Sequence, residues 1–184
     1  MPSRLCFALL VLATVLTGAP PQARASLVRA MDLALLTRSA DQIIVGDVLS
    51  VTAVWDRDHR NIYSTVEIGV RETWKGAAPA TGKIVIRHLG GSVGEIEMAV
   101  LGEVSFAAGE RSVLFLRDAH TVGMAQGKRR LRWEGSSKRW LVAAPDHRGA
   151  RVLPEPQAAP ADEALGAEES LDALRAKVRA LLQK

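Results

Sequence analysis

The 184-residue chain contains a single cysteine, Cys6, and that cysteine lies in an N-terminal apolar stretch that runs from Leu5 to Leu16. Arg4 provides a positive charge before the stretch, and Ala23-Arg24-Ala25 matches the small-x-small pattern of a signal-peptide cleavage site. We therefore expect residues 1–25 to be a secretory signal peptide that is cleaved near Ala25, so that the mature protein is secreted or periplasmic. Such a mature chain would carry neither a disulfide nor a reactive thiol.

Long hydrophobic runs are also missing. The stretch at the N-terminus falls short of the roughly 20 apolar residues that span a bilayer, and no later run is longer. We therefore expect no transmembrane segment in the mature chain.

A strong excess of one charge is absent as well. Without Arg4 and Arg24, the 24 basic residues become 22, against 20 acidic residues, so the net charge falls from +4 to +2. A nearly neutral, exported chain does not favour a nucleic-acid partner, so none is expected.

The chain lacks a P-loop, a dinucleotide-binding fingerprint and an H-E-x-x-H sequence. Its four histidines are His59, His88, His120 and His147. They share no ligand spacing and none neighbours a cysteine, so we expect no metal site and no cofactor.

One short motif resembles a hydrolase signature. Gly90-Gly91-Ser92-Val93-Gly94 satisfies G-x-S-x-G, and Asp118 with His120, or Asp146 with His147, follows in hydrolase order. A nucleophile elbow also requires a helix directly after the serine and a parallel sheet, and the sequence indicates neither. A serine hydrolase that uses Ser92 is therefore only an alternative, and no catalytic residue is assigned.

What the chain does contain is a long β-hairpin between Asp41 and Gly76. Its first half is a dense β-branched run interrupted by Gly46, which indicates a strand that is buried on both sides or bulged partway, with the glycine at a bulge or at a tight barrel bend. Its second half, from Ile62 to Lys75, alternates apolar and polar residues as a half-buried strand does. The polar segment Asp56 to Asn61 between them predicts the turn.

Further short strands, punctuated by glycine, follow the hairpin. They are expected at Lys83 to Leu89, Arg111 to Arg117, Thr121 to Trp133 and Trp140 to Ala143. Closely spaced strands without intervening helices predict a mainly β domain over residues 26–145, an antiparallel OB-like barrel of five or six strands.

Two helices are expected beside the barrel. The first is a short amphipathic helix from Leu27 to Ala40, where Leu27, Met31 and Leu35 recur at helical spacing. A Pro/Ala-rich linker over residues 146–167 then precedes a C-terminal amphipathic helix over 168–184, with Ser170 as its N-cap. The apolar stripe of this second helix could pack on the barrel or on a partner.

Basic residues and tryptophans gather near the end of the predicted barrel, where Lys138, Arg139 and Trp140 follow a basic run across a turn. Basic residues beside stacking aromatics suit an anionic surface or polymer, although a solvated strand face has the same pattern. Together with the glycine-rich loop, this region supplies the predicted ligand-binding residues Ser92, Lys128, Arg130, Arg132 and Trp133.

The hairpin also carries a family resemblance. Ala40 to Val51, with the pattern AD-hydrophobics-G-x-V-x-x-V, and Val66 to Gly76 resemble the first two strands of netrin-like and TIMP-like domains. Ala40 to Lys128 is also similar to a group of uncharacterised exported bacterial proteins. The resemblance implies an OB-type barrel. TIMP-like inhibition uses an N-terminal cysteine, whereas this mature chain would begin at Ser26.

These observations predict an exported, non-enzymatic binding module that contacts an unknown protein or an anionic envelope component through a strand face and loops. A protease-inhibitor-like module that lacks the N-terminal cysteine is the alternative, together with the hydrolase.

Overall fold

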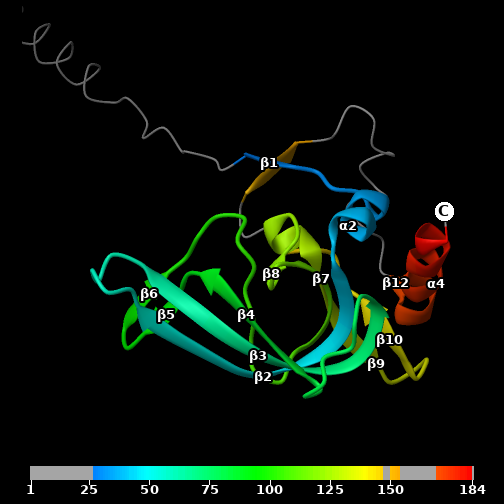
Figure 1. The fold of residues 1–184 in the computed structure, drawn as a ribbon, viewed down its shortest axis with the longest axis horizontal. Coiled ribbons are helices and arrows are strands. Elements are labelled where there is room, and N and C mark those ends of the chain that lie inside the picture. Colours follow the sequence, from blue (N-terminus) through cyan, green and yellow to red (C-terminus); the bar gives the residue numbers. More distant parts are fainter. Residues whose placement is uncertain (1–26, 147–149, 154–168, 184) are drawn as a thin grey trace, which may run out of the picture.

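The computed structural model describes residues 27–146, 150–153 and 169–183. The predicted signal peptide and most of the predicted linker lie outside these residues. The described chain is mainly β, with one large antiparallel sheet and two α-helices, which confirms the predicted fold class at that level (Figure 1).

The predicted hairpin is present as strands β2 (Gln42–Trp55) and β3 (Ile62–Lys75), which pair antiparallel. Asp56 shapes the turn, because its carboxylate accepts 2.8 Å hydrogen bonds from the Arg60 backbone N–H and the Asn61 side chain. The register shifts between Val45 and Gly46, so the structure shows the first of the two features expected at this glycine, a bulge. A Cβ there would lie 2.4 Å from Ile68 Cγ2, so the strands approach closely only because the residue is glycine.

The hairpin lies within an eight-stranded sheet. Its order is β12 (Glu169–Ser170), β10 (Arg139–Val142), β9 (Lys128–Glu134), β7 (Arg111–Arg117), β2, β3 and β4 (Lys83–Leu89), with β8 (His120–Thr121) paired to β7. The sheet therefore has more strands than the five or six expected, partly because β8 and β12 are two-residue strands without a sequence pattern. Among the described residues no pairing joins β4 to β12, so the closed barrel stays a prediction.

One predicted strand is divided. Thr121 to Trp133 was expected to be one strand interrupted by Gly123 and Gly127, but the 3₁₀ helix η1 (Met124–Gly127) separates β8 from β9. The helix begins after Gly123, whose φ of 66° is left-handed and ends the extended backbone.

The prediction for Leu27 to Ala40 was wrong in its first half. Leu27–Arg29 form β1, which pairs in parallel with β11 (Arg151–Leu153), a segment that was expected to be linker. The helix α2 (Leu33–Ser39) begins only after Asp32, whose carboxylate accepts a 2.6 Å hydrogen bond from the Leu35 N–H.

The C-terminal helix α4 (Leu171–Leu182) begins after its predicted cap, since Ser170 Oγ accepts a 3.2 Å hydrogen bond from the Ala173 N–H. Its apolar stripe packs on the sheet, which decides between the two expected roles. Leu171, Leu174 and Val178 are buried with residues of α2, β2 and β7. No helix of the described chain is long and apolar enough to cross a membrane.

The sheet thus has two covered faces. The helix-covered face packs Val45, Phe115 and Leu131 against α2 and α4. The loop-covered face buries Ile44, Ile68, Ile86 and Leu114, with Phe106 from the loop before β7 packed against them.

Candidate functional site

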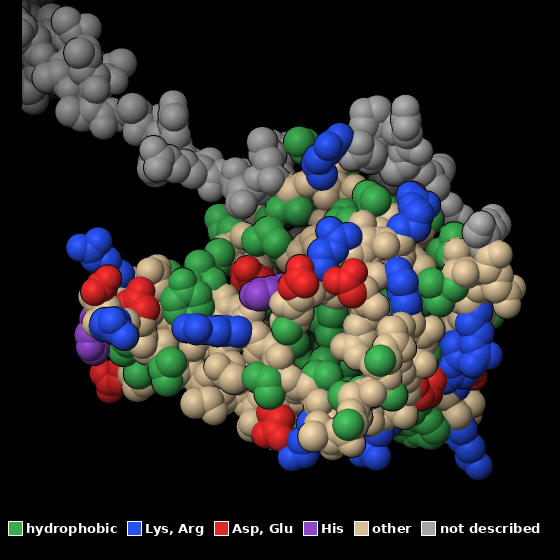
Figure 2. Space-filling model, viewed as in Figure 1, with side chains coloured by type: hydrophobic (Ala, Val, Ile, Leu, Met, Phe, Trp, Pro, Cys, Tyr) green, Lys and Arg blue, Asp and Glu red, His purple; other side chains and the backbone are tan. Residues whose placement is uncertain are grey.

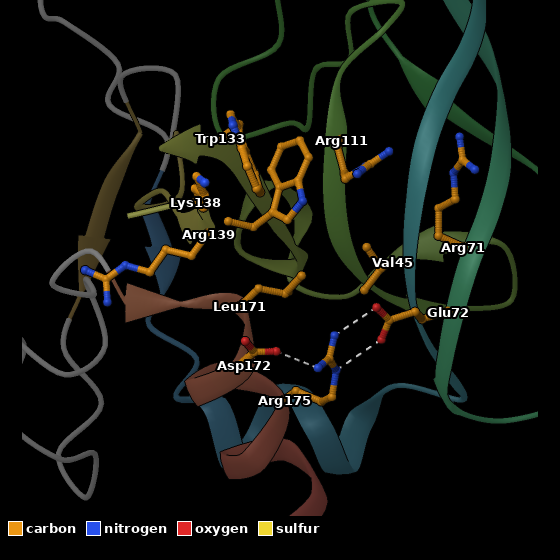
Figure 3. A pocket seen from close by; sticks show the side chains of 11 residues that line it. Val45, Arg71, Glu72, Arg111, Trp133, Lys138, Arg139, Leu171, Asp172 and Arg175 are labelled. Carbon is orange, nitrogen blue, oxygen red and sulfur yellow. Dashed lines mark hydrogen bonds and ion pairs between the residues drawn. The ribbon is translucent and has the colours of Figure 1, made fainter. Parts of the chain in front are cut away.

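A cleft of about 370 Å³ opens on the helix-covered face, between the β9–β10 hairpin and the first turn of α4 (Figure 3). We call it the Trp133 cleft. Its lining comprises Val45, Arg71, Glu72, Arg111, Trp133, Lys138, Arg139, Trp140, Leu171, Asp172 and Arg175.

Two tryptophans form its aromatic wall. Trp133 and Trp140 are directly paired across β9 and β10, so their side chains lie on the same face of the sheet. Their ring centroids are 5.3 Å apart at an interplanar angle of 62°, an edge-to-face arrangement. Trp133 remains 50% exposed, which leaves much of its indole available for contact.

Arg111 connects this wall to a carboxylate on β2. Its guanidinium lies 4.5 Å from the Trp140 ring centroid and donates to Asp47 from Nε at 2.5 Å and from Nη2 at 3.0 Å. Arg71 Nε donates to the same carboxylate at 2.7 Å. The hydrogen bond from Arg111 is the main reason why the pKa of Asp47 lies below its usual value, and it raises the pKa of Arg111.

The opposite wall comes from α4 and β3. Arg175 donates to both oxygens of Glu72, at 2.8 Å and 3.1 Å, and to Asp172 Oδ1 at 2.6 Å (Figure 3). Val45 and Leu171, which are both buried, provide apolar surface between the walls. The cleft therefore combines an aromatic wall, an apolar base and a polar wall.

Cations outnumber carboxylates in the lining, by five to two. Two of the five cations, Arg71 and Arg111, form ion pairs with Asp47. A third, Arg139, has its Nε 3.7 Å from Glu134 Oε2. Lys138 makes no ion pair with the part of the chain that the structure describes. Figure 2 shows Lys and Arg side chains gathered at the right-hand edge, over the β9–β10 end of the sheet, with acidic side chains among them.

The structure does not bring the predicted binding residues together. Successive residues of β9 point to opposite faces, so Lys128, Arg130 and Arg132 lie on the loop-covered face and Trp133 on the other. Of the five predicted binding residues, only Trp133 lines the cleft. Arg130 and Arg132 are exposed on their own face.

Lys128 is largely enclosed. Its side chain is 12% exposed, forms an ion pair with Glu110, donates to the Ser105 carbonyl and lies 4.5 Å from the Phe106 ring centroid. Burial lowers the pKa of its amine, and burial also lowers the pKa of the adjacent Arg129 to about 10. The contacts of Lys128 therefore connect β9 to the loop that covers this face.

Ser92 lies elsewhere, exposed in the small hairpin of β5 (Gly91–Val93) and β6 (Ile96–Met98). It lines a separate hollow of about 410 Å³ together with His88 and Glu97. A strand, not a helix, follows the glycine-rich turn, so Ser92 lacks the strand–turn–helix context of a nucleophile elbow.

Most residues of the cleft could not be predicted from the sequence, because its cations and carboxylates come from segments that are far apart in sequence. Lys138 and Arg139 had a signal, since they follow the β9 run across a tight turn. Glu72, Arg111 and Arg175 had none, because nothing in the spacing of β3, β7 and α4 indicates that these residues meet. No group of three or more His, Cys, Asp or Glu in the described chain could hold a metal ion.

Comparison with known proteins adds no family to these observations. The likeness to netrin-like and TIMP-like domains, and the inhibitor alternative that it implies, therefore stay predictions. A scan against protein-family models finds no match, and a search of curated proteins finds none either.

Proposed function

We propose that this protein is an exported binding module that holds a ligand with an anionic group in the Trp133 cleft. The observation that carries the proposal is the half-exposed Trp133 at the edge of a cleft whose lining has five cations and two carboxylates. Export rests on the signal-peptide pattern of residues 1–25. An OB-type barrel is the architecture that we propose for the curled sheet.

The walls of the cleft support binding because they are already ordered. Arg111 is fixed by Trp140 and Asp47, and Arg175 is fixed by Glu72. Side chains that are held before binding lose little conformational entropy when a ligand arrives. An indole next to cations provides flat apolar contact together with charge attraction, which suits an anionic polymer or an acidic partner of the cell envelope.

The test uses the protein recovered after export and three immobilised polymers: dextran sulfate, poly-L-glutamate and neutral dextran. We expect binding to the two anionic polymers that weakens with salt. Trp133→Ala should weaken it at least fivefold, since exposed tryptophans are frequent binding hot spots. Lys138→Asn should also weaken it, and the fold should tolerate asparagine at the φ of 50° that Lys138 adopts.

Arg57→Asn is the matched control, because it removes an exposed cation from the β2–β3 turn, which does not line the cleft. This variant should bind as the wild type does. The proposal is wrong if neither anionic polymer binds, or if Arg57→Asn weakens binding as much as Lys138→Asn.

A further inference from the structure

Arg175 is held on one side by Glu72, while its Nη1 donates to Asp172, and all three residues line the cleft. Glu72 accepts two hydrogen bonds from it, from Nη2 at 2.8 Å and from Nε at 3.1 Å, and Trp74 Nε1 donates to Glu72 at 2.9 Å. Arg175 also lies 5.7 Å from the centroid of the Trp74 ring. The guanidinium therefore has a fixed orientation, with its Nη1 edge directed to Asp172 (Figure 3).

Asp172 occupies that edge with a carboxylate that is itself exposed to water. Its Oδ1 lies 2.6 Å from Arg175 Nη1, and its side chain is 80% exposed, against 24% for Arg175. The pair is an i,i+3 pair on a helix surface, a class that contributes little to stability. Arg175 is fixed by several partners, whereas only this contact holds the Asp172 carboxylate among the described residues.

We propose that Asp172 is an internal competitor, which occupies the place on Arg175 Nη1 that the anionic group of the ligand takes. The inference rests on the proposed function. A carboxylate, sulfate or phosphate has anionic oxygens that accept hydrogen bonds from a guanidinium as the Asp172 carboxylate does, so it can replace Asp172, which then turns to solvent. The ligand then keeps its anion at Arg175 and its flat or apolar part against Trp133 and Trp140, across the cleft.

This arrangement gives Asp172 a role in selectivity. An anion that arrives without apolar contact must displace Asp172 with charge alone, whereas one attached to a flat or apolar body also gains the aromatic wall. The cleft should therefore discriminate against small free anions.

The test is Asp172→Asn, which removes the competing charge and keeps the size of the side chain. We expect it to bind dextran sulfate and poly-L-glutamate about twofold to fivefold more tightly, the range that corresponds to an exposed ion pair. Asp118→Asn is the matched control. It makes the same change of net charge at an exposed position with φ of 49°, at the opposite end of β7 from Arg111.

A double-mutant cycle with Arg175→Gln locates the effect. In the Arg175→Gln protein, adding Asp172→Asn should no longer increase the affinity for dextran sulfate. Circular dichroism must show that the Arg175→Gln variant and the double variant are both folded. An increase that persists there, or one that Asp118→Asn reproduces, is a general charge effect and overturns the inference.

Failure of the inference differs from failure of the proposed function. If the anionic polymers bind wild type and Trp133→Ala weakens binding, but Asp172→Asn does not strengthen it, only the role of Asp172 is wrong. If wild type binds neither polymer, the proposed function fails and the inference fails with it.

Discussion

The two faces of the sheet each carry a group of charged side chains, and the groups differ in their access to water. On the loop-covered face, Lys128 and Glu110 form an ion pair in which both side chains are 12% exposed. In the Trp133 cleft, the side chains of Arg71 and Arg175 are 64% and 24% exposed. In the enclosed pair, the two charges neutralise each other and a ligand cannot reach them. In the open cleft, hydrogen-bond donors of the arginines remain accessible to a ligand. A run of cations along one strand therefore does not by itself identify a binding surface. The exposure of each side chain and the face of the sheet on which it lies must also be known.

The strongest test of this comparison concerns whether α4 belongs to the helix-covered face. Leu174→Ala removes a side chain that is 2% exposed and should lower the free energy of unfolding by about 3 kcal/mol. Leu182→Ala, on the same helix at 39% exposure, should lower it by about 0.5 kcal/mol or less. Urea denaturation measures both. Equal effects would mean that α4 does not cover the sheet in solution, and the cleft would lose one wall.

The enclosed pair gives the next largest effect. Glu110→Ala leaves the Lys128 ammonium in a mostly buried place without its carboxylate, which should cost about 2 kcal/mol of unfolding free energy. Combining it with Lys128→Met should recover much of the loss, because the buried charge is removed as well. Glu95→Ala, at an exposed turn position, is the control. If Glu110→Ala and Glu95→Ala behave alike in chemical denaturation, the two faces do not differ as described.

The dependence of stability on pH tests the helix-covered face further, because Arg71 and Arg111, which line the cleft, both donate to the Asp47 carboxylate. The pKa of Asp47 is below its usual value, so its contribution to stability is present above about pH 4 and is lost as the pH falls through the folded-state pKa. Asp47→Asn should therefore be less stable than wild type at pH 7, and the difference should narrow below about pH 4. Thermal unfolding between pH 2 and pH 7 tests this, with Asp118→Asn as the reference; a constant difference would contradict it.

Apart from the control substitutions, the smallest effect on stability should come from the residue that matters most for binding. Trp133→Ala should change the free energy of unfolding by about 1 kcal/mol or less, because the indole is already 50% exposed and Trp140 remains in place. Denaturant midpoints check this in the same samples that are used for polymer binding. A loss as large as that of Leu174→Ala would make Trp133 a core residue rather than the wall of a binding cleft.

Local patterns explain which elements could be predicted. The polar turn after Trp55, the bulge at Gly46 and the cap at Ser170 are each determined by residues near in sequence, and each is confirmed. The predicted alternation of β3 is confirmed only from Ile62 to Ile68, because burial no longer alternates beyond Gly69 and Trp74 packs in the helix-covered cluster, not with Val66 and Ile68. The pairing of β1 with β11 could not be predicted, because it joins segments that are separated by most of the chain and lack a strong strand pattern.

The candidate site shows the same division. The two-residue period of β9 already implied that Trp133 faces away from Lys128, Arg130 and Arg132, so grouping them as one surface overlooked a local rule. That Lys128 is enclosed could not be foreseen, because Glu110 and Phe106 reach it from another segment.

By itself, the sequence determined a mainly β chain with a leading hairpin, a capped amphipathic C-terminal helix and no complete catalytic motif, since hydrophobic periodicity, turn residues and caps act over a few residues. Only the tertiary structure decided that this helix packs on its own sheet and that Arg175 meets Glu72 across the cleft from Trp140. Those contacts depend on the curl of the sheet and on which face each strand presents, and such geometry emerges only when distant segments pack together.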